Sequence, residues 1–505
     1  MILGEERAAT GIMAATLDDL FRRAGVRDPD ALALADPPNR MSFLGTAPRN
    51  LTYGEADRAI SALAARLREL GLQTDSPVAT QLPNTVEGVI AFLGILRAGM
   101  IAVPLPLLWR REEIVAALSK VSAKAIITFS HIGGVGHAAI AMGAAAELFT
   151  VRYVCGFGAD LPDGMIDLDD IFNPDAAGTS KISIRPGVAA AHLAAVTFGS
   201  DTAGIVALAR SHSELVAGGL SIFLECGAPQ GENFLSTIPP SSFAGLAVSI
   251  MPWLLSGGSL HLHHGFDPAT FAEQSRAFRG GSVTLPASTI YSLRAAGFLD
   301  DADRVLVALW HGPERLSAAK PWAGRLELVD AIAIGEFGII AAHRRPNGLP
   351  SPIPHGVITA PRGAIGAVTV LETARSDTGT LELRGPMVPL QTFPAGSGHA
   401  AGSSDTRGYR DTESVCLLDR NTQTLAVTAP PSGLVSVGGY CFRQGTIEAR
   451  IAKADPGATV VALPDALLGQ RLAGASADRA RLYAELDEST VNPLISGAFL
   501  PRSTA

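Results

Sequence analysis

The segment best suited to chemistry is 197–212, which reads TFGSDTAGIVALARSH. Its glycine and hydroxyl residues follow a short apolar run and precede a predicted helix, an arrangement that can surround a phosphate chain with backbone N–H groups and hydroxyls. Glycine, serine and threonine also form ordinary turns, so composition leaves both interpretations open. A Walker loop is excluded, because that motif needs a lysine and none occurs between Lys181 and Lys320.

A carboxylate and a group of histidines are the other side chains with metal chemistry. Glu336 follows the apolar run 329–335, where it either binds a metal ion through its oxygens or simply ends a strand or helix. His261, His263 and His264 form an H-x-H-H group, but on a strand the first two share one face and the third points away. We expect structural or surface roles for these histidines. No G-x-S-x-G elbow supports a serine hydrolase.

Composition narrows the class of protein. The chain has 505 residues, of which 47% are apolar and 17% charged, so it can bury a large core in two to four domains. A net charge of −8 and a pI near 5.8 argue against a nucleic-acid partner, because phosphate neutralisation needs a basic surface. The four cysteines are scattered without a C-x-x-C pair, which predicts reduced thiols rather than a zinc site.

The sequence predicts a cytoplasmic protein without a transmembrane segment. The first residues carry acids and lack the continuous apolar core of a signal peptide. The most apolar stretch, 89–109, is interrupted by Arg97, Gly99, Pro104 and Pro106. A membrane-spanning helix of about 20 residues disfavours such breaks, so this stretch is expected to form a buried helix, a turn and a strand.

The elements that must position the candidate residues alternate between helix and strand. Thr52 and Glu55 form a T-x-x-E capping box before an amphipathic helix, and an apolar strand is predicted at 78–82. The alternation continues with a helix ended by Gly99, a strand at 100–105, a helix at 112–119 and a strand at 125–129. This rhythm is typical of a parallel, doubly wound α/β sheet.

Changes in this rhythm predict four parts. A polar segment rich in glycine and proline at 173–186 ends the first α/β subdomain, and alternation resumes until about residue 345. Short strands separated by glycine and proline then suggest a small β-barrel-like subdomain. The linker-like TAPPSG at 428–433 begins a shortened α+β C-terminal domain. The expected parts are therefore 1–185, 186–345, 346–427 and 428–505.

Two segments carry a family resemblance. LTYGEADRAISALAARLRELGL at 51–72 and QLPNTVEGVIAFLGILRAGMIAVPL at 81–105 resemble fold-bearing motifs of the adenylate-forming (AMP-binding) acyl-CoA synthetases. The similarity covers nearly the whole chain. Members of this family activate a carboxylic acid with ATP and pass the acyl group to a thiol. The resemblance therefore implies ATP, Mg²⁺ and CoA as cofactors, and a carboxylic acid or an acyl-CoA as the small-molecule partner.

The resemblance assigns the polar segment to the family's phosphate loop. The alignment is fixed on the Ser-His pair at 211–212. In this register the loop keeps small polar residues, and Gly204 lies one position from the family's last loop glycine. Val206 stands in place of the lysine that binds the phosphates. Arg210 is the nearest substitute cation, or else the solvated face of a helix. The implied nucleotide-binding residues of this loop are Thr197, Ser200, Asp201, Thr202 and Gly204.

Other family motifs are matched in part. Ser242 stands at the substrate-side position, followed by Gly245. ALWHGPERL at 308–316 resembles the turn that borders the adenine and acyl pocket, which implies Gly312 on the nucleotide side and His311 on the substrate side, with Trp310 and His311 as bulky intrusions. The resemblance gives Glu336 as the Mg²⁺ ligand, with Ile332 in place of the aromatic residue that stacks on adenine. By the same resemblance, the ribose-binding acid corresponds to the Asp-Thr-Glu run at 411–413, which includes Glu413. Asp405 is the other candidate for this role.

The C-terminal motifs have lost their cations. The hinge motif appears as APPSG at 429–433 without its arginine, and no lysine follows Lys453 to serve in adenylation. Gly439 and Glu448 remain in register with the following hairpin and helix.

Two functions follow from this pattern. The first is an AMP-forming ligase for a fatty or aryl acid with impaired or altered activity, and the alternative is a non-catalytic pseudoenzyme that binds an acyl ligand or a protein partner without any cofactor. Four cationic or aromatic features are missing, and one lost charge-stabilising donor can lower a rate on the order of 10²–10³-fold. We therefore expect weak ATP binding or none. The helix–strand frame is nevertheless expected to bring Glu336 and the 197–204 loop to one cleft.

Overall fold

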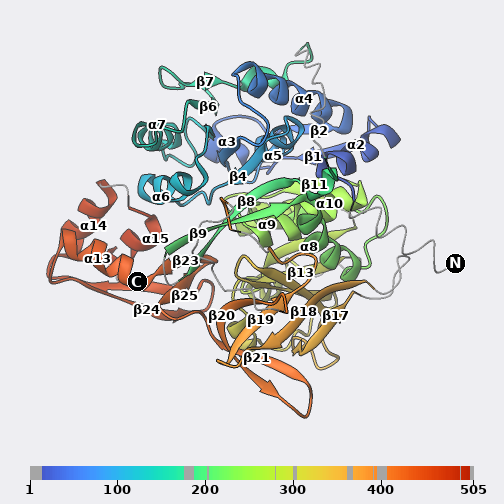
Figure 1. The fold of residues 1–505 in the computed structure, drawn as a ribbon, viewed down its shortest axis with the longest axis vertical. Coiled ribbons are helices and arrows are strands. Elements are labelled where there is room, and N and C mark those ends of the chain that lie inside the picture. Colours follow the sequence, from blue (N-terminus) through green and yellow to red (C-terminus); the bar gives the residue numbers. More distant parts are fainter. Residues whose placement is uncertain are drawn as a thin grey trace.

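The computed structural model describes residues 14–175, 187–201, 204–278, 280–299, 304–360, 368–389, 392–394, 407–488 and 491–500. Two large, mostly parallel sheets lie against one another, with an antiparallel sheet below them and a separate C-terminal group of elements at one side (Figure 1). Among the described residues, every helix is too short or too polar to span a bilayer.

The first sheet is parallel except for its last pair. Its strands are β3 (Pro77–Gln81), β4 (Ile101–Pro104), β5 (Ala125–Phe129), β6 (Tyr153–Phe157), β7 (Ile166–Asp167), β8 (Leu193–Asp201) and β9 (Gly204–Ser211), in the order β7-β6-β5-β3-β4-β8-β9. The antiparallel β8–β9 pair closes one edge. The helices that connect the parallel strands are α5 (Val86–Arg97), α6 (Arg111–Val121) and α7 (His137–Glu147), and α3 (Arg40–Leu44) and α4 (Tyr53–Glu69) precede the first of these strands.

Local signals explain these helices. The Thr52 hydroxyl accepts from the N–H of Glu55, whose carboxylate accepts from the N–H of Thr52, so the predicted capping box begins α4. Gly99 follows α5 with a φ of +77°, a left-handed conformation that glycine adopts without strain. Nearly every residue of α5 is buried, which is why its sequence is apolar on all sides.

The second sheet has the order β15-β14-β13-β12-β10-β11-β1-β2. Its strands are β1 (Leu32–Ala35), β2 (Asn50–Thr52), β10 (Phe234–Ser236), β11 (Leu260–Leu262), β12 (Ser282–Pro286), β13 (Val305–Trp310), β14 (Glu327–Ile334) and β15 (Gly338–His343). Its helices are α2 (Leu17–Arg27), α8 (His212–Glu225), α9 (Phe243–Val248), α10 (Ile250–Ser256), α11 (Pro268–Ala277) and α12 (Ile290–Ala295). Only the outer pairs β1–β2 and β14–β15 are antiparallel.

The two sheets exchange segments of chain. The N-terminal β1 pairs with β11 in the second sheet, whereas β8 pairs with β4 in the first. The expected boundary between residues 185 and 186 lies outside the described residues, and neither sheet is confined to one side of it. The ranges 1–185 and 186–345 therefore do not coincide with the two sheets, because strand pairing joins residues distant in sequence.

The remainder of the chain forms antiparallel hairpins. One sheet contains β16 (Ile353–Pro354), β17 (Gly356–Thr359), β18 (Thr369–Arg375), β19 (Thr380–Arg384), β20 (Arg410–Asp419) and β21 (Thr424–Ala429). The C-terminal elements are β22 (Leu434–Val437), β23 (Tyr440–Arg443), α13 (Gln444–Ala454), β24 (Thr459–Asp465), β25 (Gly469–Ala475), α14 (Arg479–Glu488) and α15 (Pro493–Ser496). They have a hydrophobic cluster of their own. The expected α/β class with parallel sheets and a mixed C-terminal part is confirmed.

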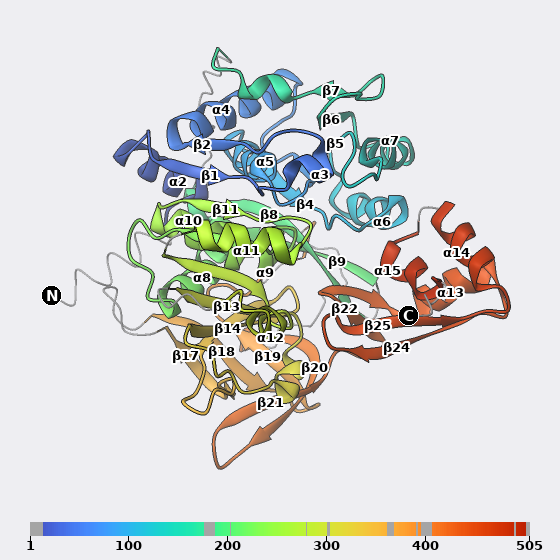
Figure 2. The same cartoon turned by 180° about the vertical axis from the view of Figure 1, so that it is seen from behind.

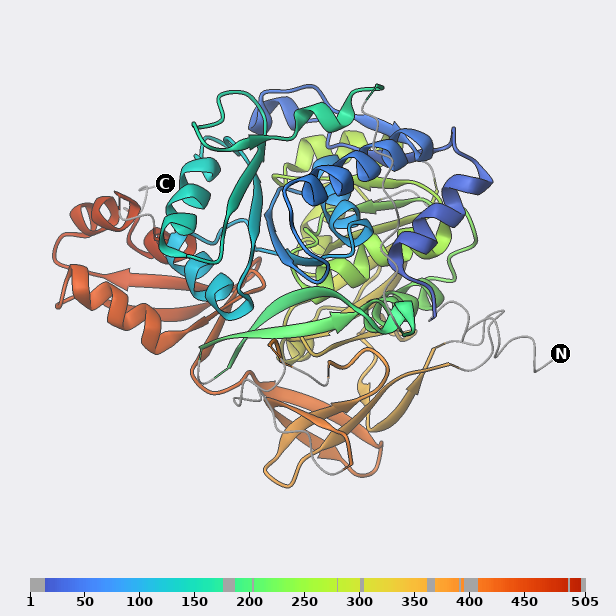
Figure 3. The same cartoon turned by 45° about the horizontal axis from the view of Figure 1, so that its top comes forward.

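The C-terminal elements lie beside α6 and the β8–β9 hairpin when the molecule is viewed from the front and from behind (Figures 1 and 2). An ion pair between Arg450 of α13 and Glu112 of α6 joins the two parts. The β8–β9 hairpin, drawn in green, extends from the first sheet toward this C-terminal part (Figure 3). Helix α6, the β8–β9 hairpin and the C-terminal elements, which are distant in sequence, thus lie together.

Candidate functional site

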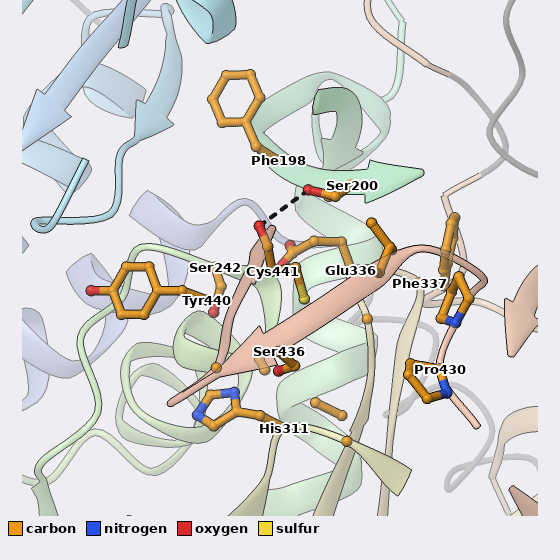
Figure 4. Close-up of a pocket in the computed structure, with 18 of the residues that line it drawn as sticks. Phe198, Ser200, Ser242, His311, Glu336, Phe337, Pro430, Ser436, Tyr440 and Cys441 are labelled. Atoms are coloured by element: carbon orange, nitrogen blue, oxygen red, sulfur yellow. Dashed lines mark hydrogen bonds between the residues drawn. The ribbon is translucent and has the colours of Figure 1, made fainter. Parts of the chain in front are cut away.

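A cavity of about 280 Å³ lies where these segments meet. Its wall comes from the β8–β9 hairpin, the turn after β14, the loop after β13, the start of β20 and the β22–β23 hairpin (Figure 4). The candidate residues that line it are Ser200, Asp201, Ser242, His311, Gly312, Glu336 and Glu413. Thr197, Gly204, Arg210 and Gly245 do not line it, and Thr202 lies outside the described residues. The 197–204 segment and Glu336 thus share one cavity.

The candidate phosphate segment is a β-hairpin rather than a strand leading into a helix. Ser200 pairs with Ile205 and Asp201 with Gly204, so much of the backbone is committed to the antiparallel ladder. The helix α8 starts only at His212, and Ser211 and Glu214 form a capping box that occupies its N-terminus. The expected phosphate cradle at a helix start is therefore wrong in its geometry, because the following residues pair as a second strand.

Glu336 is positioned by a turn and by contacts from two elements. It follows Gly335, whose φ of +50° turns the chain after β14. Its Oε2 accepts from the backbone N–H of Phe243 at 2.8 Å. Burial raises the pKa of the Glu336 carboxyl, while the charge of Arg210, the Phe243 N–H and the Thr197 hydroxyl act to lower it.

Arg210 is not on a solvated helix face. It lies on β9 with its side chain fully buried, and its Nη1 donates to the carbonyl of Met387 at 2.7 Å. Its Nη2 donates to the carbonyl of Glu336, and its guanidinium carbon lies 3.6 Å from the centre of the Phe243 ring. Burial lowers the pKa of Arg210 to about 10. This arginine fixes the backbone behind the cavity and adds no cation to its wall.

Ser242 and Gly245 both have structural roles at the start of α9. The Ser242 hydroxyl accepts from the Gly245 N–H at 3.0 Å, which caps the helix. A Cβ at Gly245 would lie 2.1 Å from the carbonyl oxygen of Pro239, so only glycine fits there. Ser242 still lines the cavity, whereas Gly245 supports it from behind.

Of the two bulky residues expected to intrude beside the adenine, His311 reaches the cavity and Trp310 does not. Trp310 is buried in the sheet core and donates from its indole nitrogen to Asp330 at 2.7 Å, so it does not intrude into the cavity. Ile332 is likewise buried, and its neighbour Ala333 lines the cavity instead. His311 does line the cavity, where its ring packs so closely against Gly439 that a Cβ there would lie 2.9 Å away.

The 411–413 run enters the cavity at the start of β20. Asp411 accepts from the Thr380 hydroxyl at 2.9 Å and from the Glu413 N–H at 2.8 Å, and Thr412 donates to the carbonyl of Leu381. Glu413 adopts a φ of +59°. Burial raises the pKa of the Glu413 carboxyl, and the nearby charges of Asp201 and Asp411 raise it further. The competing Asp405 lies outside the described residues.

The cavity wall is acidic. Its carboxylates are Asp201, Glu314, Glu336, Asp411 and Glu413, and the described residues that line it include no lysine or arginine. His311 is the one histidine in that lining, and burial together with the charge of Arg315 lowers its pKa to about 4, which keeps the ring neutral near pH 7. Val206, the residue at the position of the family's loop lysine, lines the cavity with an aliphatic side chain.

Several residues that line the cavity were not predicted from the sequence. The β22–β23 hairpin contributes Ser436, Tyr440 and Cys441, and the Ser200 hydroxyl donates to the carbonyl of Cys441 at 3.5 Å (Figure 4). Trp109 and Phe198 add aromatic rings from the first sheet. The aromatic SVGGYCF run was visible in the sequence, but only docking of the C-terminal part brings it to the cavity.

Comparison with known proteins identifies the family. The sequence profile described as "AMP-binding enzyme" matches residues 21–343, which is more than half of the chain. The chain belongs to the AMP-binding enzyme family. The expected relationship to adenylate-forming ligases is thereby confirmed.

Related sequences of this AMP-binding family include ligases and parts of peptide synthetases. The chain is 38% identical to a salicyl-AMP ligase / salicyl-S-ArCP synthetase of Mycobacterium tuberculosis, over 19% of this chain and 16% of that protein. It is 31% identical to a medium-chain fatty-acid–CoA ligase of Escherichia coli, over 22% and 18%. With tyrocidine synthase 3 of Brevibacillus parabrevis, 31% identity extends over 23% of this chain and 2% of that protein. The matched stretches are thus short parts of these relatives.

Solved structures share the family fold over almost the whole chain. The amide bond synthetase McbA from Marinactinospora thermotolerans has a TM-score of 0.70 at 19% identity, covering 94% of both chains. Apo MbtA from Mycobacterium smegmatis has a TM-score of 0.66 at 20% identity, covering 96% of this chain and 92% of that one. At these identities the comparison supports the fold alone.

Proposed function

We propose that this AMP-binding family member binds a small molecule in its cavity without forming an acyl-adenylate from ATP. The observation that carries the proposal is the acidic wall, which has five carboxylates and, among the described residues, no lysine or arginine. Two like charges about 4 Å apart repel by about 4 kcal/mol at an effective dielectric constant of 20. A triphosphate would meet this repulsion with no lysine or arginine in the described lining to pair with, because Arg210 and Arg315 lie behind the wall beside Glu336 and Glu314.

Cavity size supports the same proposal. At about 280 Å³ the cavity is slightly below the range of about 300–1000 Å³ found for drug-sized ligand sites. The β22–β23 hairpin occupies one wall and contacts Ser200. In this arrangement the open space is near the lower end of the range for one drug-sized ligand.

The residues present do not fit Mg²⁺–ATP as the family uses it. Mg²⁺ in nucleotide sites is held by one or two carboxylates together with the substrate phosphates. Glu336 offers one such carboxylate, whose Oε2 accepts from Phe243, but the described lining holds no lysine or arginine to bind the phosphates that would complete the coordination. The proposed function therefore includes no step that uses ATP, Mg²⁺ or CoA.

An active ligase is the second candidate, because Glu336 still reaches the cavity beside the hairpin. A Cβ at Gly199 would lie 3.7 Å from the Glu336 side chain, so the two segments are in direct contact. In this alternative, Glu336 would hold Mg²⁺, and the acid would be a fatty or aryl acid like those in the names of the relatives.

Calorimetry with ATP, with and without Mg²⁺, and carboxylate-dependent pyrophosphate exchange separate the two candidates. Salicylate, anthranilate and octanoate serve as the test acids. We expect no ATP binding heat and no exchange, and we expect Val206→Lys alone to restore neither. Micromolar ATP affinity together with exchange that disappears in Glu336→Gln would establish the ligase instead.

A further inference from the structure

The cavity combines two kinds of side chain that recognise the same class of ligand. Its carboxylates supply negative charge, and its aromatic residues supply ring faces that attract cations. The aromatic residues in the lining are Trp109, Phe198, Phe337 and Tyr440. The inference drawn from this combination rests on the proposed function, since a cavity that must hold ATP would need the opposite charge.

The carboxylates surround the cavity rather than forming one surface cluster. Asp201 comes from the end of β8, Asp411 and Glu413 come from β20, and Glu336 follows β14. Glu314 lies after β13, in a short helical turn, and burial raises the pKa of its carboxyl. Four separate chain segments therefore place acidic side chains around the same space. A ligand that carries a positive charge would stabilise the ionised form of the carboxyls buried there.

The four aromatic rings of the cavity differ in whether an arginine of the protein already lies over them. The guanidinium of Arg410 lies 5.7 Å from the centre of the Phe337 ring. Among the described residues, no arginine or lysine lies over the rings of Trp109 and Phe198, whereas the charge of Arg110 acts on the Tyr440 phenol. Trp109 and Phe198 form a tilted pair with their centres 5.6 Å apart, which leaves ring surface at the cavity.

We infer that the cavity binds a small organic cation, an amine or amidine carried on an aromatic or apolar body, and rejects carboxylates and phosphates of the same size. The cationic head would pair with the carboxylates, and the body would pack on the rings and on apolar wall residues such as Ile238 and Leu434. Hydroxyls of Ser200, Ser242 and Ser436 supply additional hydrogen bonds.

The test uses three probes of nearly equal shape that differ in charge: benzamidinium, benzamide and benzoate. Cys441 reports occupancy, because it lines the cavity and is exposed to solvent, whereas Cys155, Cys226 and Cys416 are buried. Maleimide reacts with the thiolate, so labelling is run at mildly alkaline pH with excess reagent. Mass spectrometry of the intact full-length protein measures the labelling rate.

We expect benzamidinium at millimolar concentration to slow labelling of Cys441 most, benzamide less and benzoate least, with protection by benzamidinium weakening as salt increases. Glu413→Gln should weaken benzamidinium binding about tenfold, the loss typical of one charge-assisted hydrogen bond, while leaving benzamide binding unchanged. Glu314→Gln provides a second variant if Glu413→Gln fails to fold. Glu69→Gln, on the exposed surface of α4, is the matched control and should change neither probe.

Equal protection by the three probes, stronger protection by benzoate, or no protection by any of them would overturn the inference. These outcomes are distinguishable from failure of the proposed function. Pyrophosphate exchange with a carboxylic acid would refute the proposed function itself, whereas a reversed order of probes without exchange would refute only the assignment of the ligand's charge.

Discussion

Arg210, Glu336 and Phe243 form one positioning unit behind the cavity. The guanidinium donates to the Glu336 carbonyl and lies over the Phe243 ring, and the Phe243 N–H donates to the Glu336 carboxylate. The arrangement places a buried cation where it supports an acid without reaching the cavity. Arg210, the expected substitute for the phosphate-binding lysine, is therefore a structural support for Glu336.

Replacing Arg210 tests this role. Arg210→Met keeps an unbranched apolar stem but removes the guanidinium, which leaves the carbonyls of Met387 and Glu336 without their donors. We expect the free energy of unfolding to fall by about 2–3 kcal/mol, since each unpaired buried group costs about 1–3 kcal/mol. Urea unfolding measures the change, and the exposed Arg420→Met is the control. A change below about 0.5 kcal/mol would contradict the assigned role.

At the scale of elements, the sequence predicted what depends on neighbouring residues. The Thr52–Glu55 box, the end of α5 at Gly99 and the parallel strands β3 to β5 are set by local side chains and by apolar periodicity. The hairpin at 197–212 was not predicted, because an apolar run such as 205–209 fits a helix or a strand, and its pairing with β8 decides which. The burial of Arg210 follows from that same pairing.

The start of α9 offers a test at the element scale. Gly245→Ala would place a Cβ 2.1 Å from the Pro239 carbonyl oxygen, a backbone atom that cannot rotate away. We expect a loss of about 1–3 kcal/mol in the free energy of unfolding, as for other overpacked sites. Gly445→Ala is the matched control, because nothing lies within 4 Å of its added Cβ. Alanine in α13 should stabilise by up to about 1 kcal/mol.

Equal effects of the two glycine substitutions would show that α9 can shift away from Pro239. The Ser242 cap would then be too loose to hold this part of the cavity wall. Opposite signs would show that α9 is fixed at its first turn, which is the condition for Phe243 to present its N–H to Glu336.

At the scale of the whole molecule, the cavity exists only because chain segments from both sheets, the antiparallel sheet and the C-terminal part converge. The sequence identified most of the acids and glycines one by one through the family resemblance. It did not show that the acids face one another, since Asp201 and Glu413 are more than two hundred residues apart and meet through the fold. The charge of the cavity is thus a property of the assembled molecule.

Buried imidazoles should make the whole fold sensitive to acid. Burial is the main reason that the pKa of His137 falls to about 3, and those of His264 and His311 to about 4, below the ordinary value of 6.5. The unfolded chain binds protons at these sites below pH 6.5 while the folded chain does not. Each histidine therefore contributes stability near neutral pH that is lost as the pH falls from about 6.5 toward the folded pKa. Buried carboxyls with raised pKa, such as Glu113 and Glu214, act in the opposite direction.

A single substitution isolates the histidine contribution from that of the carboxyls. His137 is buried, with its Nδ1 3.1 Å from the Gln81 Oε1, and its pKa predicts a loss of about 2 kcal/mol between pH 7 and pH 5. In His137→Asn this loss should disappear from the difference in unfolding free energy measured by urea titration at the two pH values. An unchanged pH dependence in His137→Asn would mean that the imidazole is already protonated in the folded protein near pH 5, and that water reaches this site despite its burial.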